Sequence, residues 1–194
     1  MNLQTSIDRE ALAALPIRRY EGEVVVVDSP ARFSEAAAEL MAEDVVGFDT
    51  ETRPAFRPGE SYLPSLFQAA TSRRVWLFQV QRVDCAAVLA PLLASPSVVK
   101  AGVSVADDLK KLKQVFPFEE QAVLDLGAAA RRHNVKQSGV RNLAGLFLGF
   151  RIPKGNSTSN WAAAQLRPQQ IAYAAMDAWA CRTLYLKFRE LGFV

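Results

Sequence analysis

The order of the β-rich runs along the chain is the feature that most constrains how it can fold. Runs rich in β-branched and aromatic residues predict strands at residues 24–27, 45–49, 65–71, 75–80 and 98–102. The third and fourth runs are separated only by Ser-Arg-Arg, which predicts an antiparallel hairpin, whereas the later part of the chain alternates between strand and helix patterns. A hairpin followed by such alternation is typical of an α/β fold with a mixed sheet.

Helices are predicted between and after these strands, at residues 5–15, 34–43, 84–94, 107–116, 121–132, 140–149 and 168–191. A Thr or Ser cap is expected for the first of them. Pro168 suits the first turn of the last helix, because a proline there loses no hydrogen bond. Stretches rich in proline, glycine or polar residues predict loops at 52–64 and 151–161.

Length and composition describe one ordinary globular domain. Half of the 194 residues are apolar and 22% are charged, which is enough apolar material for a sizeable core. No repeat, linker or low-complexity tract interrupts the pattern. We expect a single domain over residues 1–194, with a helical extension at 1–22 and the core at 23–191.

Several classes of protein are disfavoured by composition. The first 16 residues mix acidic and basic side chains without a long apolar run, so we expect no signal peptide. No window holds the ~18 uncharged apolar residues that a membrane span requires. Cys85 and Cys181 lie far apart in apolar contexts, which indicates reduced thiols and a cytoplasmic protein. His133 is the only histidine, which excludes multi-histidine metal sites.

Charge alone does not identify a partner, since the net charge is only +3. Its distribution is uneven, with ten basic residues against five acidic ones between positions 100 and 154. Such an excess is compatible with a phosphate-binding face. On charge alone, however, ordinary solvated helix surfaces are the preferred interpretation.

A pair of carboxylates ends the predicted strand in VVGFDTE, residues 45–51. Alternate side chains of a strand point the same way, so Asp49 and Glu51 lie on one face with Cα atoms about 6.5–7 Å apart. Two like charges this close raise each other's pKa unless a cation lies between them. The pair is therefore either solvated at the strand end or holds a metal ion.

Two further acidic motifs follow in other structural contexts. Asp107 and Asp108 lie where the strand at 98–102 gives way to a helix, a position that also favours acidic residues for purely structural reasons. Tyr173 and Asp177 are four residues apart on the last helix and hence on one face. The neighbours of Asp177 are apolar or small, and a buried carboxylate needs a partner. Each motif is common alone, so the interpretation depends on their conjunction.

In this order and context the motifs resemble those of the DEDD 3′–5′ exonucleases, and the tyrosine indicates the DEDDy branch. The surrounding sequence is similar to the exonuclease domain of the Werner syndrome helicase and to the catalytic domain of RNase D. The pieces that match are GFDTE, LFQAAT, VVKAGVSVADDLKKL, LDLGAAA, VRNLAGLFLGFRIPK, SNWAAAQLRPQQIAYAAMDA and ACRTLY, which span residues 24–188. The resemblance implies an RNase H-like (DnaQ-like) α/β fold, with a mixed central sheet of about five to six strands flanked by helices.

The resemblance also implies roles for individual residues. The metal ligands and catalytic carboxylates would be Asp49, Glu51, Asp108 and Asp177, with Asp49 shared by two cations, and Tyr173 would orient or deprotonate the attacking water. Family spacing from Gly102 selects Asp108 rather than Asp107. Lys111 and Lys154 are candidate phosphate contacts. Four carboxylates suit two hard cations, Mg²⁺ or Mn²⁺, better than zinc.

The activity implied is release of nucleoside 5′-monophosphates from the 3′ end of single-stranded DNA or RNA by two-metal-ion hydrolysis. One alternative is a catalytically weak module of the same fold that holds a 3′ end. The four carboxylates and the tyrosine disfavour it, because a pure binder gains nothing from negative charge that faces phosphates. Another alternative is an α/β hydrolase that uses the same metals on a nucleotide. The sequence leaves the choice between DNA and RNA open.

Overall fold

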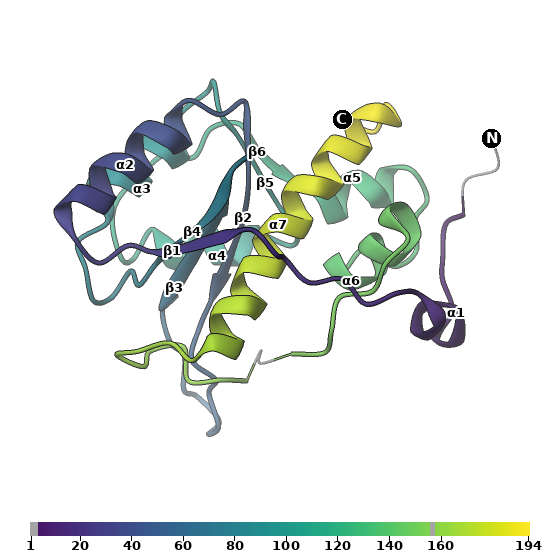
Figure 1. The fold of residues 1–194 in the computed structure, drawn as a ribbon, viewed down its shortest axis with the longest axis horizontal. Helices are drawn as coiled ribbons and strands as arrows, with labels where there is room; N and C mark the ends of the chain where they lie inside the picture. Colours follow the sequence, from purple (N-terminus) through teal and green to yellow (C-terminus); the bar gives the residue numbers. More distant parts are fainter. Residues whose placement is uncertain (1–3, 156–157) are drawn as a thin grey trace.

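The computed structural model of the chain describes residues 4–155 and 158–194, in which a central sheet is flanked by helices (Figure 1). The sheet has six strands in the order β1-β4-β3-β2-β5-β6. They are β1 (Glu23–Val26), β2 (Val45–Glu51), β3 (Leu66–Ala70), β4 (Arg74–Phe78), β5 (Val99–Gly102) and β6 (Val123–Asp125). β3 pairs antiparallel with both β2 and β4, whereas β1 with β4, β2 with β5 and β5 with β6 pair in parallel. The predicted hairpin and mixed sheet are confirmed.

The helices agree with the predicted order but differ in their ends. They are α1 (Arg9–Ala14), α2 (Pro30–Met41), α3 (Ala86–Ala94), α4 (Ala106–Leu112), α5 (Leu126–Arg132), α6 (Val140–Leu143), a π-helical turn η1 (Ala144–Leu148) and α7 (Pro168–Glu190). The cap of α1 is Asp8, whose carboxylate accepts from the Ala11 amide at 2.7 Å, so the predicted Thr or Ser cap was wrong. Of the predicted loop at 151–161, residues 156–157 lie outside the described part of the chain.

The predicted helix at 121–132 was wrong in its first half. Val123–Asp125 forms the edge strand β6, which pairs in parallel with β5 from Lys100 to Gly102. Asp125 ends the strand and starts α5, because its side chain accepts from the Ala128 amide at 3.1 Å. A three-residue strand has too little periodicity to be recognised alone, and pairing with β5 decides its conformation.

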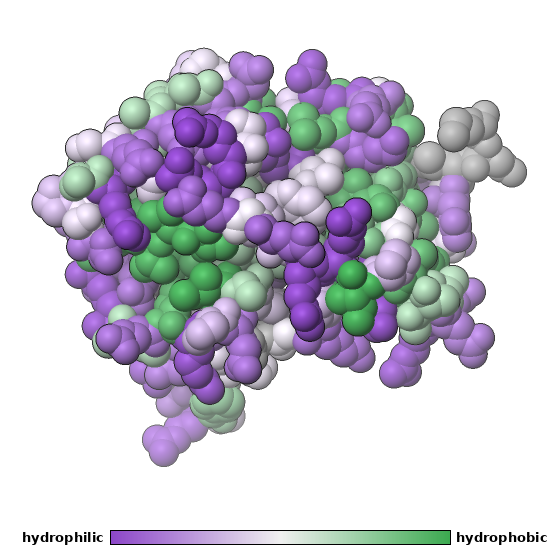
Figure 2. All heavy atoms as spheres, in the orientation of Figure 1, coloured by the Kyte–Doolittle hydropathy of each residue, from purple (hydrophilic) through white to green (hydrophobic). Residues whose placement is uncertain are grey.

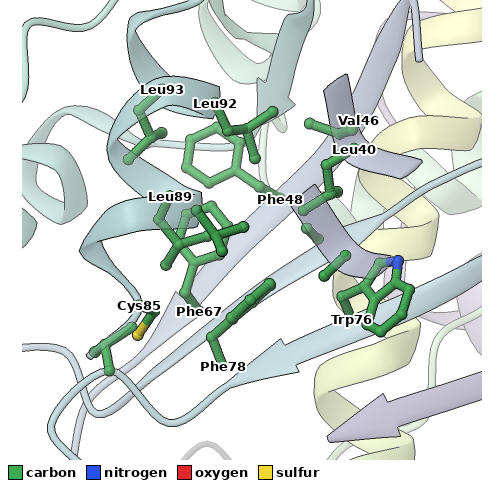
Figure 3. Close-up of a cluster of buried hydrophobic side chains, with 14 of the residues drawn as sticks. Leu40, Val46, Phe48, Phe67, Trp76, Phe78, Cys85, Leu89, Leu92 and Leu93 are labelled. Atoms are coloured by element: carbon green, nitrogen blue, oxygen red, sulfur yellow. The ribbon is translucent and has the colours of Figure 1, made fainter. Parts of the chain in front are cut away.

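One face of the sheet forms the largest apolar core, against α2, α3 and α4. Alternate residues of β2, β3 and β4 point to this side, among them Phe48, Phe67 and Phe78, which are fully buried. Figure 3 shows these rings between the sheet and the leucines of α3. The rings of Phe48 and Phe67 stack with centroids 5.7 Å apart. The residues between them in β2 consequently point to the opposite face.

α7 covers that opposite face, and Gly47 allows it to lie close to β2. A Cβ atom added at Gly47 would lie 2.2 Å from the carbonyl oxygen of Ala178 and 2.3 Å from the amide nitrogen of Arg182, both in the α7 backbone. Ala174, Ala175 and Ala178 are fully buried in the same interface. Small residues on both sides therefore bring the long helix onto the strand that carries Asp49 and Glu51.

We expect Gly47→Ala to destabilise the protein, since backbone atoms of α7 cannot give way as a flexible side chain could. The free energy of unfolding should fall by roughly 1–3 kcal/mol, the usual cost of overpacking. Urea denaturation measures it. Gly139→Ser is the matched control, because its added Cβ meets nothing within 4 Å and serine suits the N-cap of α6. Equal stability of Gly47→Ala and wild type would contradict the close packing.

The segment between α1 and β1 is fixed to the body of the protein. Ile17 forms a parallel bridge with Arg151, and the Arg151 amide donates to the Pro16 carbonyl at 2.9 Å. The ring of Tyr20 lies against that of Trp179 on α7, with centroids 6.0 Å apart. Within the described residues, no helix has both the length and the apolar character needed to cross a membrane.

Candidate active site

β2 carries two acidic side chains onto the face covered by α7. The strand continues to Glu51, two residues beyond its predicted end, because Asp49, Thr50 and Glu51 pair with β3. Asp49 and Glu51 therefore share one face of a regular strand, as their spacing predicts. Thr50 lies between them and points to the other face.

Asp177 joins this pair from α7. Carboxylate oxygens of Asp49, Glu51 and Asp177 all lie within 4.8 Å of one another. Glu51 and Asp177 are buried, with 8% and 4% of their surface exposed, and Asp49 is half-buried. The structure thus brings together acidic groups from a strand and a helix that are more than a hundred residues apart in the sequence.

Burial and mutual repulsion disfavour the charged forms of these groups. Burial, and then the charges of Asp49, Asp177 and Asp108, raise the pKa of Glu51 to about 9. Burial raises the pKa of Asp177 to about 6, against a hydrogen bond from Tyr173 and the charge of Arg141. The pKa of Asp49 is also well above its ordinary value, chiefly through burial. A cation would relieve this repulsion, and a set of oxygen donors fits Mg²⁺ or Mn²⁺.

Asp108 lies beside this acidic cluster rather than inside it. Its Oδ1 atom accepts a hydrogen bond from the Thr50 hydroxyl at 2.6 Å. Burial raises the pKa of Asp108, although the Thr50 hydrogen bond and the charge of Lys111 oppose the increase. Its charge in turn contributes to the raised pKa values of Asp49 and Glu51. Asp107 is exposed and lines a surface hollow instead.

Tyr173 lies one helical turn before Asp177 and donates a hydrogen bond to its carboxylate. Burial and the surrounding carboxylates raise the pKa of the Tyr173 hydroxyl far above its usual value. The hydroxyl is therefore protonated at neutral pH and acts as a hydrogen-bond donor in this arrangement. The backbone of Gly155 lies against the ring, since an added Cβ would be 2.0 Å from Cδ2 of Tyr173.

The two candidate phosphate contacts line different hollows. Lys154 is exposed and lines a hollow of about 450 Å³ together with Tyr173 and Gly155. Lys111 is half-buried and lines another, of about 490 Å³, together with Tyr62. Lys111 is also close enough to Asp108 for its charge to lower the pKa of that carboxyl.

Sequence reasoning missed three residues at or near the site and one exposed aromatic ring in the loop that follows β2. Gln68 is opposite Asp49 on β3, fully buried, and its side-chain atoms have no hydrogen-bond partner among the described residues. An amide inside the apolar run LFQAAT was a signal that could have identified it. Thr50 and Arg141 reach the site only through the tertiary fold. Phe56, in the loop after β2, is 81% exposed, which a proline-rich loop does not reveal in sequence.

A divalent cation should stabilise this cluster most at neutral and alkaline pH. Because Glu51 and Asp177 bind protons more tightly in the folded state, their contribution to stability is present below the unfolded pKa, ~4, and is lost as pH rises through about 6 and about 9. With a chelator present, the melting temperature should therefore fall between about pH 5 and about pH 9.

Saturating Mn²⁺ should raise the melting temperature more at about pH 8 than at about pH 5. Thermal melts at both pH values, with Mn²⁺ or a chelator, measure this difference. Glu51→Gln is the control, since it removes the group with the pKa of about 9 and should flatten the pH dependence. An equal Mn²⁺ effect at both pH values would contradict a closely packed carboxylate site.

A mixed sheet with carboxylates gathered between its central strand and a long helix defines an α/β domain of the RNase H-like class. The sequence model of the 3′–5′ exonuclease family matches residues 24–192. The chain therefore belongs to the 3′–5′ exonuclease family, whose members are hydrolases. The predicted family and fold class are confirmed.

Individual relatives agree with this assignment. The chain is 30% identical over 189 residues to the bifunctional 3′–5′ exonuclease/ATP-dependent helicase WRN of Mus musculus, covering 92% of the chain and 13% of that protein. It is 30% identical over 165 residues to ribonuclease D of Gluconacetobacter diazotrophicus, covering 83% and 41%. The crystal structure of the Aedes aegypti Nibbler EXO domain superposes with a TM-score of 0.80 at 26% identity, covering 90% of this chain and 93% of that one. The chain spans well under half the length of the curated relatives that it matches.

Proposed function

We propose that the protein is a metal-dependent 3′–5′ exonuclease that releases nucleoside 5′-monophosphates from the 3′ end of a single-stranded nucleic acid. The observation that carries this proposal is the cluster of Asp49, Glu51 and Asp177, whose carboxylate oxygens lie within 4.8 Å of one another. The cluster occurs in a chain of the 3′–5′ exonuclease family. Buried carboxylates that repel one another are costly for folding, which is typical of a functional site.

The proposed cation ligands are Asp49, Glu51, Asp177 and Asp108, for two ions of Mg²⁺ or Mn²⁺. When bound, the two ions would supply Lewis-acid stabilisation of the charge that develops on the phosphodiester. The protein's own contribution is to hold the ligands in place. β2 fixes two of them at the spacing of a strand, α7 fixes Asp177, and the Thr50 hydroxyl orients the carboxylate of Asp108.

Tyr173 is proposed to position the water that attacks the terminal phosphodiester. Its hydroxyl already donates to Asp177, one of the proposed ligands, and its raised pKa favours orientation over proton abstraction. Lys154 and Lys111 are proposed to contact phosphates of the substrate. Lys154 lines a hollow together with Tyr173, and Lys111 lines one beside the start of the helix that carries Asp108. A lysine acts there as a point charge and reads no sequence.

The exposed ring of Phe56 is a candidate platform for a base near the 3′ end. Arg53 of the same loop is held over the ring of Tyr62, with its guanidinium carbon 4.2 Å from the ring centroid. Stacking on aromatic rings combined with backbone contacts favours single strands and tolerates any base. Discrimination between DNA and RNA would require a contact to the 2′-hydroxyl.

A single-stranded oligonucleotide labelled at its 5′ end tests the proposal. With Mn²⁺ we expect a ladder of products shortened one nucleotide at a time from the 3′ end, with 5′-mononucleotides released, and no products in chelator. A 3′-phosphorylated oligonucleotide shows whether a free 3′ end is needed. Internal cleavage, shortening from the 5′ end or activity in chelator would contradict the proposal.

Tyr173→Phe should slow cleavage without weakening the metal site. The substitution keeps the ring against Gly155 and all four carboxylates, and removes only the hydroxyl. Losing one orienting contact should reduce the single-turnover rate on the order of 10²–10⁴-fold. Oligonucleotide affinity in Ca²⁺ should barely change. Cleavage at the wild-type rate would mean that Tyr173 only packs.

A further inference from the structure

Two hollows meet at Pro153 and Lys154 and have basic walls. The first, of about 450 Å³, is lined by Arg19 and by Tyr173. The second, also about 450 Å³, has four basic residues in its wall. We call the two together the basic groove, defined by its basic side chains: Arg9, Arg19, Arg141, Arg151 and Lys154. Among the residues that the structure describes, no acidic side chain lines either hollow.

The wall formed by Arg9 and Arg19 belongs to the segment before β1. This segment lies outside residues 24–192, the part of the chain that the family model matches. In Figure 1 it runs from α1 across α7 to β1, and Figure 2 shows hydrophilic side chains over this part of the surface. The bridge between Ile17 and Arg151 fixes the segment in place. The groove wall is thus a built part of the fold.

The basic side chains of the groove are not directly paired with acidic ones, although the charge of Arg141 also acts on Asp177. Across the described residues, no carboxylate lies within 4.0 Å of a charged nitrogen of the five side chains. The Nε atom of Arg141 is buried and has no hydrogen-bond partner among them. Cations that gather without a directly paired carboxylate, one of them with an unused donor, favour binding of an anion.

The shape of the groove favours an extended polyanion over a single ion. It begins at Tyr173, where the 3′ end of the substrate would lie, and continues past Lys154 to Arg9 on α1. Apolar residues, including Ile152 and Met176, line the groove together with the cations. A wall that combines positive and apolar side chains suits the phosphates and sugars of a nucleic-acid strand.

We propose that the basic groove binds the sugar–phosphate backbone of the strand, on the 5′ side of the nucleotide in the active site. This inference rests on the proposed exonuclease function and extends it. Arg9 and Arg19 add phosphate contacts from the segment that precedes the range matched by the family model. The segment before β1 thereby sets the length of single strand that the protein prefers.

Two adjacent arginines provide the test. Arg18 and Arg19 are both exposed and belong to the same segment, but only Arg19 lines the groove. We would compare wild type, Arg18→Gln, Arg19→Gln and the double variant Arg9→Gln/Arg19→Gln. Fluorescence anisotropy with Ca²⁺ gives the affinity for a trinucleotide and for a 12-nucleotide single strand over a range of salt concentrations.

Loss of each phosphate contact should reduce the slope of log K against log salt by about 0.7 on a single strand. For the 12-nucleotide strand the double variant should lose about 1.4 from this slope and Arg19→Gln about half as much, and Arg18→Gln should match wild type. Relative to wild type, the double variant should lose much less affinity for the trinucleotide than for the 12-nucleotide strand. Thermal melts check that all variants are folded.

Three outcomes would overturn the inference: wild-type affinity and salt slope in the double variant, an equal loss in Arg18→Gln, or an equal loss for the trinucleotide and the long strand. Cleavage by the wild-type protein is measured separately. If wild type does not shorten any oligonucleotide, the proposed function fails. If wild type cleaves but the double variant binds the long strand normally, only the groove assignment fails.

Discussion

Asp49→Asn is expected to abolish nuclease activity and to leave the fold intact. Asp49 lies within 4.8 Å of both other carboxylates of the cluster and is the residue proposed to be shared by two cations. Losing a shared ligand should cost several kcal/mol of transition-state stabilisation, which is a rate loss of about 10³-fold or more. Single-turnover cleavage of a labelled oligonucleotide in Mn²⁺ measures this loss.

The same substitution should not destabilise the protein in chelator. The neutral amide of Asn is nearly the same size as the carboxylate, and the substitution removes one of three closely spaced groups whose charges repel one another. We therefore expect the melting temperature of Asp49→Asn in chelator, near neutral pH, to equal or exceed that of wild type. Activity at the wild-type level would refute the assigned role, and a large loss of stability would indicate a structural role instead.

Asp108→Asn should slow cleavage strongly, whereas Asp107→Asn should leave the rate unchanged, although the two residues are adjacent. Asp108 accepts a hydrogen bond from the Thr50 hydroxyl at 2.6 Å, and its charge raises the pKa of Asp49. Asp107, in contrast, is exposed. We expect Asp108→Asn to lose about 10²-fold or more in rate, because an amide is a far weaker cation ligand than a carboxylate. Asp107→Asn should be close to wild type.

Thr50→Val adds a third comparison for this pair. It keeps the β-branched shape and removes only the hydroxyl that orients Asp108. Its rate should fall between those of Asp108→Asn and wild type. The reverse order for Asp107 and Asp108 in the same single-turnover assay would mean that the helix start was assigned one residue wrong.

Much of the fold could be predicted because its strongest patterns are local. The hairpin of β3 and β4 has two β-rich runs and a short turn, and α7 begins at the proline that predicts its start. β6 could not be recognised, since three residues carry no clear period and their conformation depends on pairing with β5. The cap of α1 was misjudged because Thr5, Ser6 and Asp8 are all good capping residues.

The sequence predicts which residues of the candidate site are neighbours on one strand or one helix, but not how the strand and the helix come together. Strand and helix spacing relate Asp49 to Glu51 and Tyr173 to Asp177, but the contact between the two pairs depends on Gly47, which lets α7 approach β2. The hydrogen bond from Thr50 to Asp108 joins residues 58 positions apart and has no local signal. The groove wall formed by the segment before β1 is likewise a result of tertiary packing.

Calorimetric titration with Mn²⁺ near neutral pH shows whether the clustered carboxylates form a divalent-cation site. Wild type and Asp107→Asn should bind Mn²⁺ with similar affinity, whereas Asp49→Asn and Asp177→Asn should bind it at least about tenfold more weakly, a loss of about 1.4 kcal/mol. Equal Mn²⁺ affinity in all four proteins would mean that Asp49 and Asp177 do not ligate the cation.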